Sequence, residues 1–280
     1  MTHAALTRLQ DGLAALQADH LERRRLLLDG AQGARVTIDG QRVVSFCSND
    51  YLGLAADPAL VQAAHAALDE CGVGAGAAHL ITGHHRFHED FETAFARFVG
   101  KPAALLFSTG YMANLGVLTA LLGRRGEVFG DKLNHASLVD AAQLSGAAFT
   151  RYRHLDLAQL EAQLAKSAAQ DKLIASDLVF SMDGDMAPVD ALLDLAERHG
   201  AWLYLDDAHG FGVLNDGRGG LSDRARASDR VIYLATLGKA AGVAGAAVAA
   251  HAGVIDWLIQ KARPYIYTTA SPPLLAALPP

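Results

Sequence analysis

The chain has 280 residues and a formal net charge of −6, with 51% hydrophobic residues and 27 glycines. This length is enough for one large α/β domain with a sizeable core. The negative charge argues against a nucleic-acid partner, and the apolar runs are broken well before the roughly 18 residues that a membrane span needs. Cys47 and Cys71 lack paired spacing and nothing after Met1 resembles a signal peptide, so we expect a cytoplasmic protein without a membrane partner.

The N-terminal segment, residues 2–28, predicts an amphipathic helix, because leucines recur at every third or fourth position with charges between them. Near its end stands the run Arg23 to Arg25, which is usually a solvated helix face and less often an anion site. Two alternating runs then flank Asp39-Gly40 within residues 35–44. This pattern is a strong signal for a β-hairpin.

A turn is predicted over residues 45–54, where Asn49, Asp50 and Gly53 occur close together. A helix is expected to follow from Pro58 to about residue 70. The glycine-rich run behind it lacks both the preceding strand and the spacing of a dinucleotide-binding fingerprint, so we reject that interpretation.

His84 and His88 would share one face if both lie on a helix, which raises the possibility of a metal pair. No third ligand is obvious from the sequence. Capping and packing beside Thr82-Gly83 are the better interpretation, and we predict no metal site.

The next strand is predicted over residues 103–107, and Gly110-Tyr111 leads into a helix over 112–122. A glycine turn at a helix N-terminus presents backbone N–H groups and the positive end of the helix dipole to an anion. Gly110 and Tyr111 are therefore candidate phosphate-binding residues, although any βαβ unit has this geometry.

Two further strand ends carry polar side chains. His135 follows the apolar run 127–129, and its ring can lie on a planar ligand and transfer protons, or cap the helix that starts near Ser137. A strand over 172–180 ends at Ser181, which can hydrogen-bond a ligand beside a tight turn.

The strongest chemical signal comes from two later strands. An apolar run over 201–205 leads to Asp206 and His209, and another over 231–236 leads to Lys239. A lysine at a strand exit is usually a surface residue, but once desolvated it becomes an amine nucleophile that can form a Schiff base. An aspartate can keep a pyridine nitrogen protonated. Together these three residues are the set that a pyridoxal phosphate site requires.

The alternation of strand, loop and helix through most of the chain predicts an α/β fold with a mainly parallel sheet covered by helices. At this point the sequence resembles the α-oxoamine synthases, which are fold-type I pyridoxal phosphate enzymes, from about residue 21 to residue 273. Four motifs that stand in the family's order carry this resemblance: Asn49–Gly53, Phe180–Asp185, Asp206–Gly210 and Thr236–Lys239.

The resemblance implies three catalytic residues. Lys239 would hold the cofactor as a Schiff base and, once freed by the amino acid, would remove its α proton. Asp206 would pair with the pyridine nitrogen, and His135 would stack on the ring.

The resemblance also implies binding residues. His209 and Ser181 would lie at the phenolic oxygen of the cofactor. The phosphate would be held by Thr236 and by the backbone of Gly110-Tyr111. Arg23 and Asn49 would line the acyl-substrate side, and His135 would also contact substrate.

Within the family, the motifs favour the member that joins L-alanine to pimeloyl-CoA, or to pimeloyl-acyl carrier protein, with loss of CO2 in biotin biosynthesis. Relatives that use glycine or serine remain as alternatives. The resemblance implies a homodimer with shared active sites, in which Thr268 and Thr269 would reach the cofactor phosphate of the partner subunit.

Members of the family continue past Pro272-Pro273 into a C-terminal small domain, whereas this sequence stops at Pro280. We therefore expect the small domain to be absent. The expected parts are an N-terminal helix and hairpin arm over residues 1–45, a pyridoxal-phosphate-binding large domain over 46–275, and the start of the shortened C-terminal domain over 276–280.

Other functions are weighed against this one. An aminotransferase of the same fold would keep Lys239 and Asp206 but release no CO2, and a shortened chain could bind the cofactor without turnover. A P-loop is a poor match, because Gly238-Lys239 lacks the following hydroxyl residue and the earlier glycine. The Gly-x-Ser-x-Gly motif of serine hydrolases does not occur.

Overall fold

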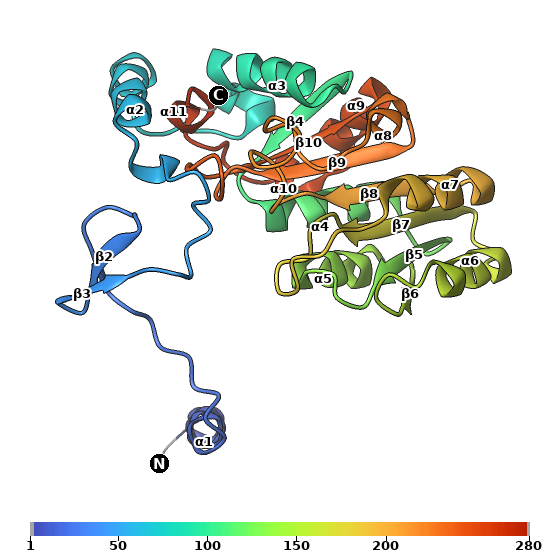
Figure 1. Ribbon diagram of the computed structural model, residues 1–280, viewed down its shortest axis with the longest axis horizontal. Coiled ribbons are helices and arrows are strands. Elements are labelled where there is room, and N and C mark those ends of the chain that lie inside the picture. Colours follow the sequence, from blue (N-terminus) through green and yellow to red (C-terminus); the bar gives the residue numbers. More distant parts are fainter. Residues whose placement is uncertain (1–2, 279–280) are drawn as a thin grey trace. The chain divides into compact units, whose positions relative to one another are not determined.

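A computed structural model describes residues 3–278, and the chain divides into two compact units, residues 1–46 and residues 47–280. The first unit contains one helix and a three-stranded antiparallel sheet in the order β1-β2-β3 (Figure 1). Its elements are α1 (Ala4–Ala18), β1 (Leu28–Asp29), β2 (Arg35–Ile38) and β3 (Gln41–Val44).

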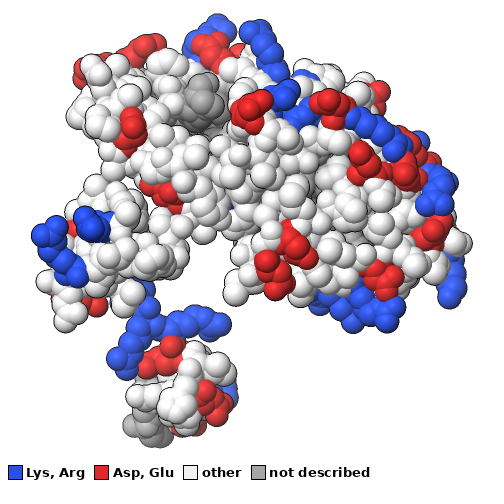
Figure 2. Space-filling view, viewed as in Figure 1, with Lys and Arg blue, Asp and Glu red and all other residues white. Residues whose placement is uncertain are grey.

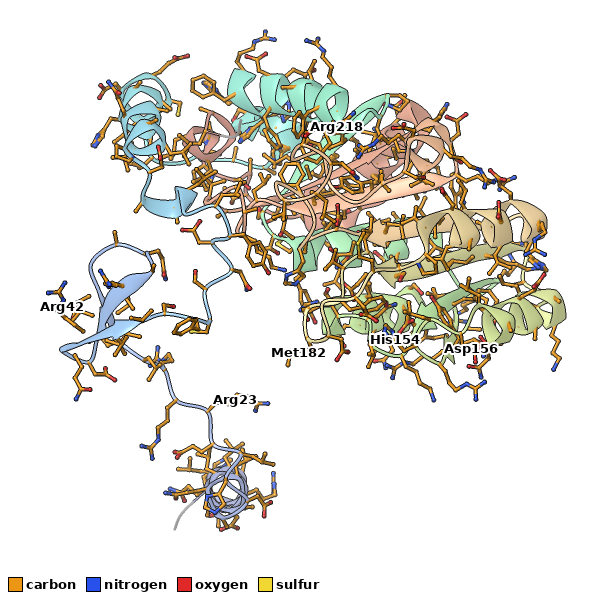
Figure 3. All side chains as sticks on the ribbon, in the orientation of Figure 1. Arg23, Arg42, His154, Asp156, Met182 and Arg218 are labelled. Atoms are coloured by element: carbon orange, nitrogen blue, oxygen red, sulfur yellow. The ribbon has the colours of Figure 1, made fainter. Side chains whose placement is uncertain are left out.

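The predicted hairpin is confirmed, whereas the predicted N-terminal helix is too long. Asp39 and Gly40 have φ values of 49° and 77°, as a two-residue turn between right-twisted strands requires. Helix α1 stops at Ala18, because His20 adopts the left-handed conformation with a φ of 55°. Arg23 therefore lies beyond the helix, on a segment without regular structure (Figure 3). Residue 2, where the predicted helix begins, lies outside the described residues.

The second unit is built on a seven-stranded sheet in the order β4-β10-β9-β8-β7-β5-β6 (Figure 1). The pairs among β5 to β9 are parallel, and β10 runs antiparallel to both β4 and β9. The prediction of a mainly parallel sheet is thus confirmed. The strands are β4 (Ala103–Phe107), β5 (Gly126–Asp131), β6 (Ala148–Tyr152), β7 (Asp171–Asp177), β8 (Trp202–Asp206), β9 (Val231–Thr236) and β10 (Ala246–Ala250).

Helices lie on both faces of this sheet. The longer ones are α2 (Pro58–Cys71), α3 (Arg86–Val99), α4 (Gly110–Leu121), α5 (Ala136–Ser145), α6 (Leu157–Lys166), α7 (Val189–His199) and α9 (Ala252–Lys261). The shorter ones are η1 (Leu54–Ala56), η2 (His79–Gly83), α8 (Asp223–Ala227), α10 (Arg263–Ile266) and α11 (Pro273–Ala276). The last two residues of the predicted segment 276–280 lie outside the described residues. On the face shown in Figure 2, basic and acidic side chains are interspersed along the helices of this unit.

Alternation along the central strands builds two apolar cores. On β8, Leu203 and Leu205 pack into the core that contains Phe95 of α3, and Tyr204 packs into the core that contains Val117 of α4. Successive side chains of a strand point to opposite faces, so a strand covered on both sides is apolar throughout. Within residues 3–278, no helix has both the length and the apolar character needed to cross a bilayer.

Three strands of the second unit differ from the sequence predictions. The strand predicted over 172–180 ends at Asp177, because the chain then leaves the sheet and Val179 makes an isolated bridge to Met186. Strands β6 and β10 were not predicted. All five residues of β10 are buried, and four of them are alanines, which have low intrinsic strand propensity.

Candidate active site

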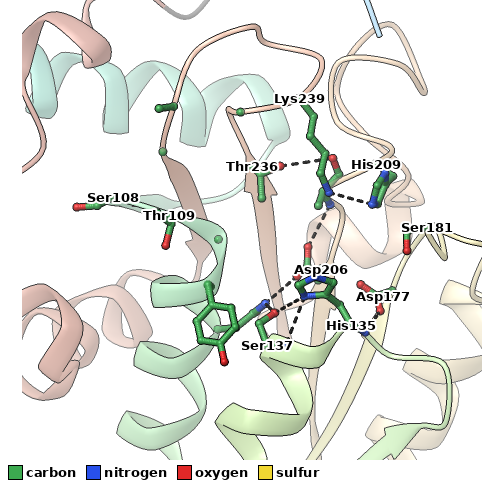
Figure 4. Close-up of a pocket in the computed structure, with 17 residues that line it drawn as sticks. Ser108, Thr109, His135, Ser137, Asp177, Ser181, Asp206, His209, Thr236 and Lys239 are labelled. Atoms are coloured by element: carbon green, nitrogen blue, oxygen red, sulfur yellow. Dashed lines mark hydrogen bonds between the residues drawn. The ribbon is translucent and has the colours of Figure 1, made fainter. Parts of the chain in front are cut away.

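A cavity of about 350 Å³ opens where the parallel strands end, which is the usual position of ligand sites in open α/β sheets (Figure 4). Figure 4 shows Lys239, Asp206 and His135 facing the same space. The lining includes every residue predicted to bind the cofactor: Gly110, Tyr111, His135, Ser181, Asp206, His209, Thr236 and Lys239.

Lys239 follows β9 and is held in the loop that leads to β10. The N–H of Gly242 donates to the carbonyl of Lys239 at 2.9 Å, and the loop closes through a bond from Leu237 to Gly245. Burial lowers the pKa of the Lys239 amine, and the charges of Asp206 and Asp177 oppose this shift only in part. The neutral amine, which is the form that acts as nucleophile and base, is therefore more accessible than in a surface lysine.

Asp206 ends β8 and is 4% exposed. Its Oδ2 accepts a bond of 2.8 Å from the amide of Asn114, and its Oδ1 accepts one of 3.1 Å from the N–H of Ala208. Burial raises the pKa of Asp206, and these bonds reduce the shift. Asp177 lies opposite Asp206 in the register of β7 and β8, where burial and the neighbouring carboxylate raise its pKa to about 8. A cation inside the cavity would relieve both carboxylates.

Asn114 is a site residue that the sequence analysis missed. This buried side chain uses both ends of its amide: the nitrogen also donates to Ser137 Oγ at 2.7 Å, and the oxygen accepts from the hydroxyl of Tyr204 at 2.6 Å. The available signal was a polar residue inside the apolar helix predicted after Tyr111. Asn114 fixes the orientation of the Asp206 carboxylate.

His135 caps α5, as the alternative interpretation proposed, and also lines the cavity. Its Nδ1 lies 2.7 Å from Ser137 Oγ and 3.3 Å from the N–H of the same residue. The backbone N–H of His135 donates to Asp177 Oδ2 at 2.6 Å. The ring is therefore held at the cavity wall from both its side chain and its backbone.

The N-terminus of helix α4 forms an anion cradle at the cavity. Thr109 Oγ1 accepts from the N–H of Met112 at 3.1 Å and caps the helix. A Cβ atom on Gly110 would lie 2.6 Å from Cγ2 of Thr236, so only glycine lets the two segments meet here. The first N–H groups of a helix have no partner within it, and they favour a phosphate. An anionic group at this end and a cationic nitrogen at Asp206 would both fit.

Ser181 lies on a loop that His154 ties to the sheet. His154 Nδ1 lies 3.0 Å from Asp131 Oδ1, and its Nε2 lies 2.7 Å from Asp185 Oδ2 (Figure 3). Burial lowers the pKa of His154, but the bonds to Asp185 and Asp131 outweigh it, and the net pKa is raised. The sequence analysis did not identify this histidine. It holds one edge of the cavity in place.

Asn49 and Arg23, the two residues predicted on the acyl side, are not among the residues that line the cavity. Asn49 lies beside it, since its Oδ1 accepts a bond of 3.3 Å from the hydroxyl of Tyr51, which in turn lies 2.6 Å from His209 Nδ1. Arg23 belongs to the first unit.

Burial and the charge of Lys239 lower the pKa of His209 to about 4, so its ring is neutral near pH 7.

The histidines near α3 form a hydrogen-bonded cluster. The prediction that His84 and His88 share a helix face is wrong, because α3 begins at Arg86 and His85 caps it. Ligand nitrogens of His79, His84 and His88 all lie within 4.8 Å of one another. Both nitrogens of His88 are engaged, by the N–H of His85 and by the carbonyl of Ser271, each at 3.0 Å. His88 thus takes part in capping α3 and in packing against the segment at Ser271.

Comparison with known proteins gives one family. The family model described as aminotransferase class I and II matches residues 41–278. An 8-amino-7-oxononanoate synthase from Thiobacillus denitrificans is 82% identical over 99% of this chain, which spans 72% of that relative. One from Chromobacterium violaceum is 60% identical over 96% of this chain and 71% of its own length.

Solved structures agree with this result. A serine palmitoyltransferase from S. paucimobilis with bound PLP superposes with a TM-score of 0.90 at 27% identity, covering 99% of this chain and 73% of that one. An 8-amino-7-oxononanoate synthase from Francisella tularensis has a TM-score of 0.71 at 35% identity, over 83% of this chain and 66% of that one.

Proposed function

Since the chain belongs to the 8-amino-7-oxononanoate synthases of the class I and II aminotransferase family, we propose that the cavity at Lys239 is where its substrates react. The reaction is the pyridoxal-phosphate-dependent condensation of L-alanine with a pimeloyl thioester in biotin biosynthesis. It yields 8-amino-7-oxononanoate, CO2 and the free thiol. The thioester is carried by CoA or by acyl carrier protein.

The residues of the cavity suit pyridoxal phosphate. We propose that Thr236 and the first N–H groups of α4, at Gly110-Tyr111, hold the phosphate, and that Asp206 faces the pyridine nitrogen. The steric demand at Gly110 and the raised pKa of the buried Asp206 support this orientation, because one end of the cavity favours an anion and the other a cation. His135, Ser181 and His209 complete the proposed set of contacts: the first against the ring and the others at its phenolic oxygen.

Lys239 is the proposed acid-base group. Its amine has a pKa below that of an ordinary lysine, because it is buried, so it is more readily neutral and can accept the α proton of alanine and later return a proton. The bound cofactor supplies an electron sink for the pair of electrons that this proton leaves behind. Asp206, kept ionised by a cationic partner, makes that sink more effective. The observation that carries the proposal is that Lys239 and Asp206, from adjacent strands, line one cavity.

The acyl side, the domains and the assembly are proposed from the family resemblance. Arg23 and Asn49 would contact the pimeloyl thioester, and His135 would also contact substrate. Residues 1–45 would act as an arm, and residues 46–275 as the cofactor-binding domain. We also propose a cytoplasmic homodimer with shared active sites, for which the exposed apolar side chains of Val73 and Ile81 provide support, since they are 78% and 76% exposed.

The test uses the purified chain, pyridoxal phosphate and its absorption spectrum. We expect a visible band from the lysine-bound cofactor that shifts with L-alanine, and CO2 release after pimeloyl-CoA is added. Lys239→Ala should lose the band, whereas Lys261→Ala, which alters an exposed lysine, should keep it. A band with no CO2 but with pyruvate would indicate an aminotransferase. A band that survives in Lys239→Ala would overturn the assignment of Lys239.

A further inference from the structure

A second cavity, of about 270 Å³, adjoins the cavity at Lys239. Ser181 and His209 line both cavities, and Figure 4 shows these two residues on the same side of the cavity at Lys239. The other residues that line the second cavity are Tyr51, Val179, Phe180, Gly184 and Val213. We call this second cavity the side groove. Because the two cavities share residues, a ligand can extend from one into the other.

The side groove is lined mainly by apolar groups. Val179 packs against the hydrophobic core, and Phe180 is part of that core and 2% exposed. The ring of His209 is neutral near pH 7, because burial and Lys239 lower its pKa to about 4. Among the described residues that line the side groove, none therefore carries a charge. Such a surface favours methylene groups over charged groups or amides.

The polar side chains at the side groove already have partners. The Tyr51 hydroxyl lies 2.6 Å from His209 Nδ1 and donates to Asn49 Oδ1 at 3.3 Å. Polar groups that are hydrogen-bonded within the protein do not need a bond from the ligand. Asn49 is also a proposed contact of the acyl substrate. The bond from Tyr51 thus links the side groove to the proposed acyl side.

We infer that the side groove holds the methylene chain of the acyl thioester, and that Val179, Phe180 and Val213 determine which chain lengths bind. The inference rests on the proposed function and identifies the part of its site that recognises the acyl group. Ser181 and His209 are proposed to lie at the phenolic oxygen of pyridoxal phosphate, which is bonded beside the ring carbon that bears the reactive aldehyde. The side groove therefore meets the cavity at the end where the amino acid and the thioester would react.

The exposed rim of the side groove suits the far end of a pimeloyl group. Tyr51 and Val213 are 44% and 48% exposed, so this part of the lining is in contact with solvent. The far end of the pimeloyl group is a carboxylate, which is costly to bury without a partner. At this rim the carboxylate can stay in water while the methylenes contact the apolar wall.

Another apolar cavity, of about 230 Å³, is less suited to the acyl chain. Its lining includes Phe98, Phe211 and Ala240. None of the described residues that line it also lines the cavity at Lys239. The side groove is therefore better placed to receive a chain whose thioester must react at Lys239.

The binding of glutaryl-, adipyl- and pimeloyl-CoA, each one methylene longer than the last, tests the inference. Isothermal titration uses the cofactor-loaded enzyme without alanine, so that no turnover occurs. In the wild type, each added methylene should tighten binding roughly fourfold. Val213→Trp, which fills the side groove, should weaken pimeloyl-CoA binding roughly 10-fold and glutaryl-CoA binding much less. Leu144→Trp, at a position 66% exposed outside the side groove, should keep the wild-type affinities.

Val213→Asn is a second variant, because it makes the wall polar without filling the side groove. It should reduce the gain in affinity per methylene. Both Val213 variants should keep the lysine-bound band and the exchange of the alanine α hydrogen in D2O, which needs no acyl thioester. Equal binding of the three thioesters by the wild type would overturn the inference. So would a wild-type gain per methylene in both Val213 variants.

CO2 release from alanine and pimeloyl-CoA separates this inference from the proposed function. If the wild type shows the gain per methylene but releases no CO2, the proposed reaction fails and the side groove stands. If it releases CO2 but binds all three thioesters equally, the side groove fails and the proposed reaction stands.

Discussion

At the scale of single residues, the site depends on groups that hold other side chains in place. Asn114 is the example, since one amide joins Asp206, Ser137 and Tyr204. Such a buried network is stable only while every member keeps its partner. The orientation of the Asp206 carboxylate therefore depends on α4, the helix that carries Asn114.

Replacing Asn114 with alanine should reduce both stability and cofactor affinity. The change leaves two buried groups, Asp206 Oδ2 and the Tyr204 hydroxyl, without this partner, and each such loss costs about 1–3 kcal/mol. Thermal unfolding and a cofactor titration measure the two effects. Tyr204→Phe serves as the control, because it removes only the bond to the amide oxygen and should weaken cofactor binding much less. Equal affinities in the two variants would contradict this account.

The anion cradle can be tested with a variant at Gly110 that a second substitution should rescue. Gly110→Ala places a Cβ atom 2.6 Å from Cγ2 of Thr236, and overpacking of this kind costs about 1–3 kcal/mol. We expect weaker cofactor binding in Gly110→Ala and recovery in the double variant Gly110→Ala/Thr236→Ser, which removes the clashing methyl but keeps the hydroxyl. Isothermal titration with pyridoxal phosphate distinguishes the variants. Failure of the second change to restore affinity would show that the methyl contact is not the cause.

At the scale of elements, the loop that carries Ser181 is held to β5 by His154, in addition to its own bridge between Val179 and Met186. The neighbouring Met182 is 91% exposed, so the loop has little packing of its own at that point (Figure 3). Asp185 and Asp131 hold the imidazole between them. The position of one cavity edge thus depends on a titratable group.

The loop should become less protected as pH rises. Bonds to Asp185 and Asp131 raise the pKa of His154 above the value of 6.5 expected in the unfolded chain, despite the opposing effect of burial. The stabilisation is therefore complete below pH 6.5 and disappears as pH rises through the higher value of the folded protein. Limited proteolysis of residues 181–187 across this range measures it. His154→Gln should remove the pH dependence, and an unchanged profile in that variant would exclude His154 as the cause.

The elements that the sequence predicted are those with a local signal. Strands β8 and β9 are apolar up to their last residues, Asp206 and Thr236, because both of their faces are covered, and the β2–β3 turn has its Asp39-Gly40 pair. Strand β10 gave no such signal, since alanine has little strand propensity by itself. Its conformation comes from β4 and β9 on either side.

The same distinction separates the site residues that were predicted from those that were missed. Lys239 and Asp206 follow apolar runs that predict strands, and an amine and a carboxylate at such positions indicate reactive groups from residue type alone. Asn114 and His154 act through partners brought near by the fold, 92 and 31 positions away in the chain. Partners so distant in sequence cannot be paired by periodicity or spacing.

At the scale of the whole molecule, the cavity belongs to one of the two units. All of its lining residues lie between Ser108 and Gly245, within the unit formed by residues 47–280. The first unit contributes Arg23 only as a proposed contact for the acyl substrate. Cofactor chemistry and acyl-chain recognition should therefore be separable.

Arg23→Ala tests this separation in the full chain. We expect the lysine-bound band and the alanine-dependent hydrogen exchange to stay unchanged, while the KM for pimeloyl-CoA rises about 10-fold, as the loss of a charged hydrogen bond would produce. Steady-state kinetics at varied pimeloyl-CoA measures this change. Arg42→Ala, an exposed arginine on β3 of the same unit, is the matched control. An unchanged KM in Arg23→Ala would remove Arg23 from the acyl site.

The place of β10 in the sheet also determines when the site can form during synthesis. Ala246 of β10 pairs with Phe107 at the end of β4, just before the anion cradle, and with Thr236 at the end of β9, just before Lys239. Until the ribosome has released residue 250, the first strand of the sheet has no neighbour to join it to the rest. Pairings between segments so far apart in the chain form slowly. The nascent protein should therefore acquire cofactor affinity only after this short run of alanines has emerged.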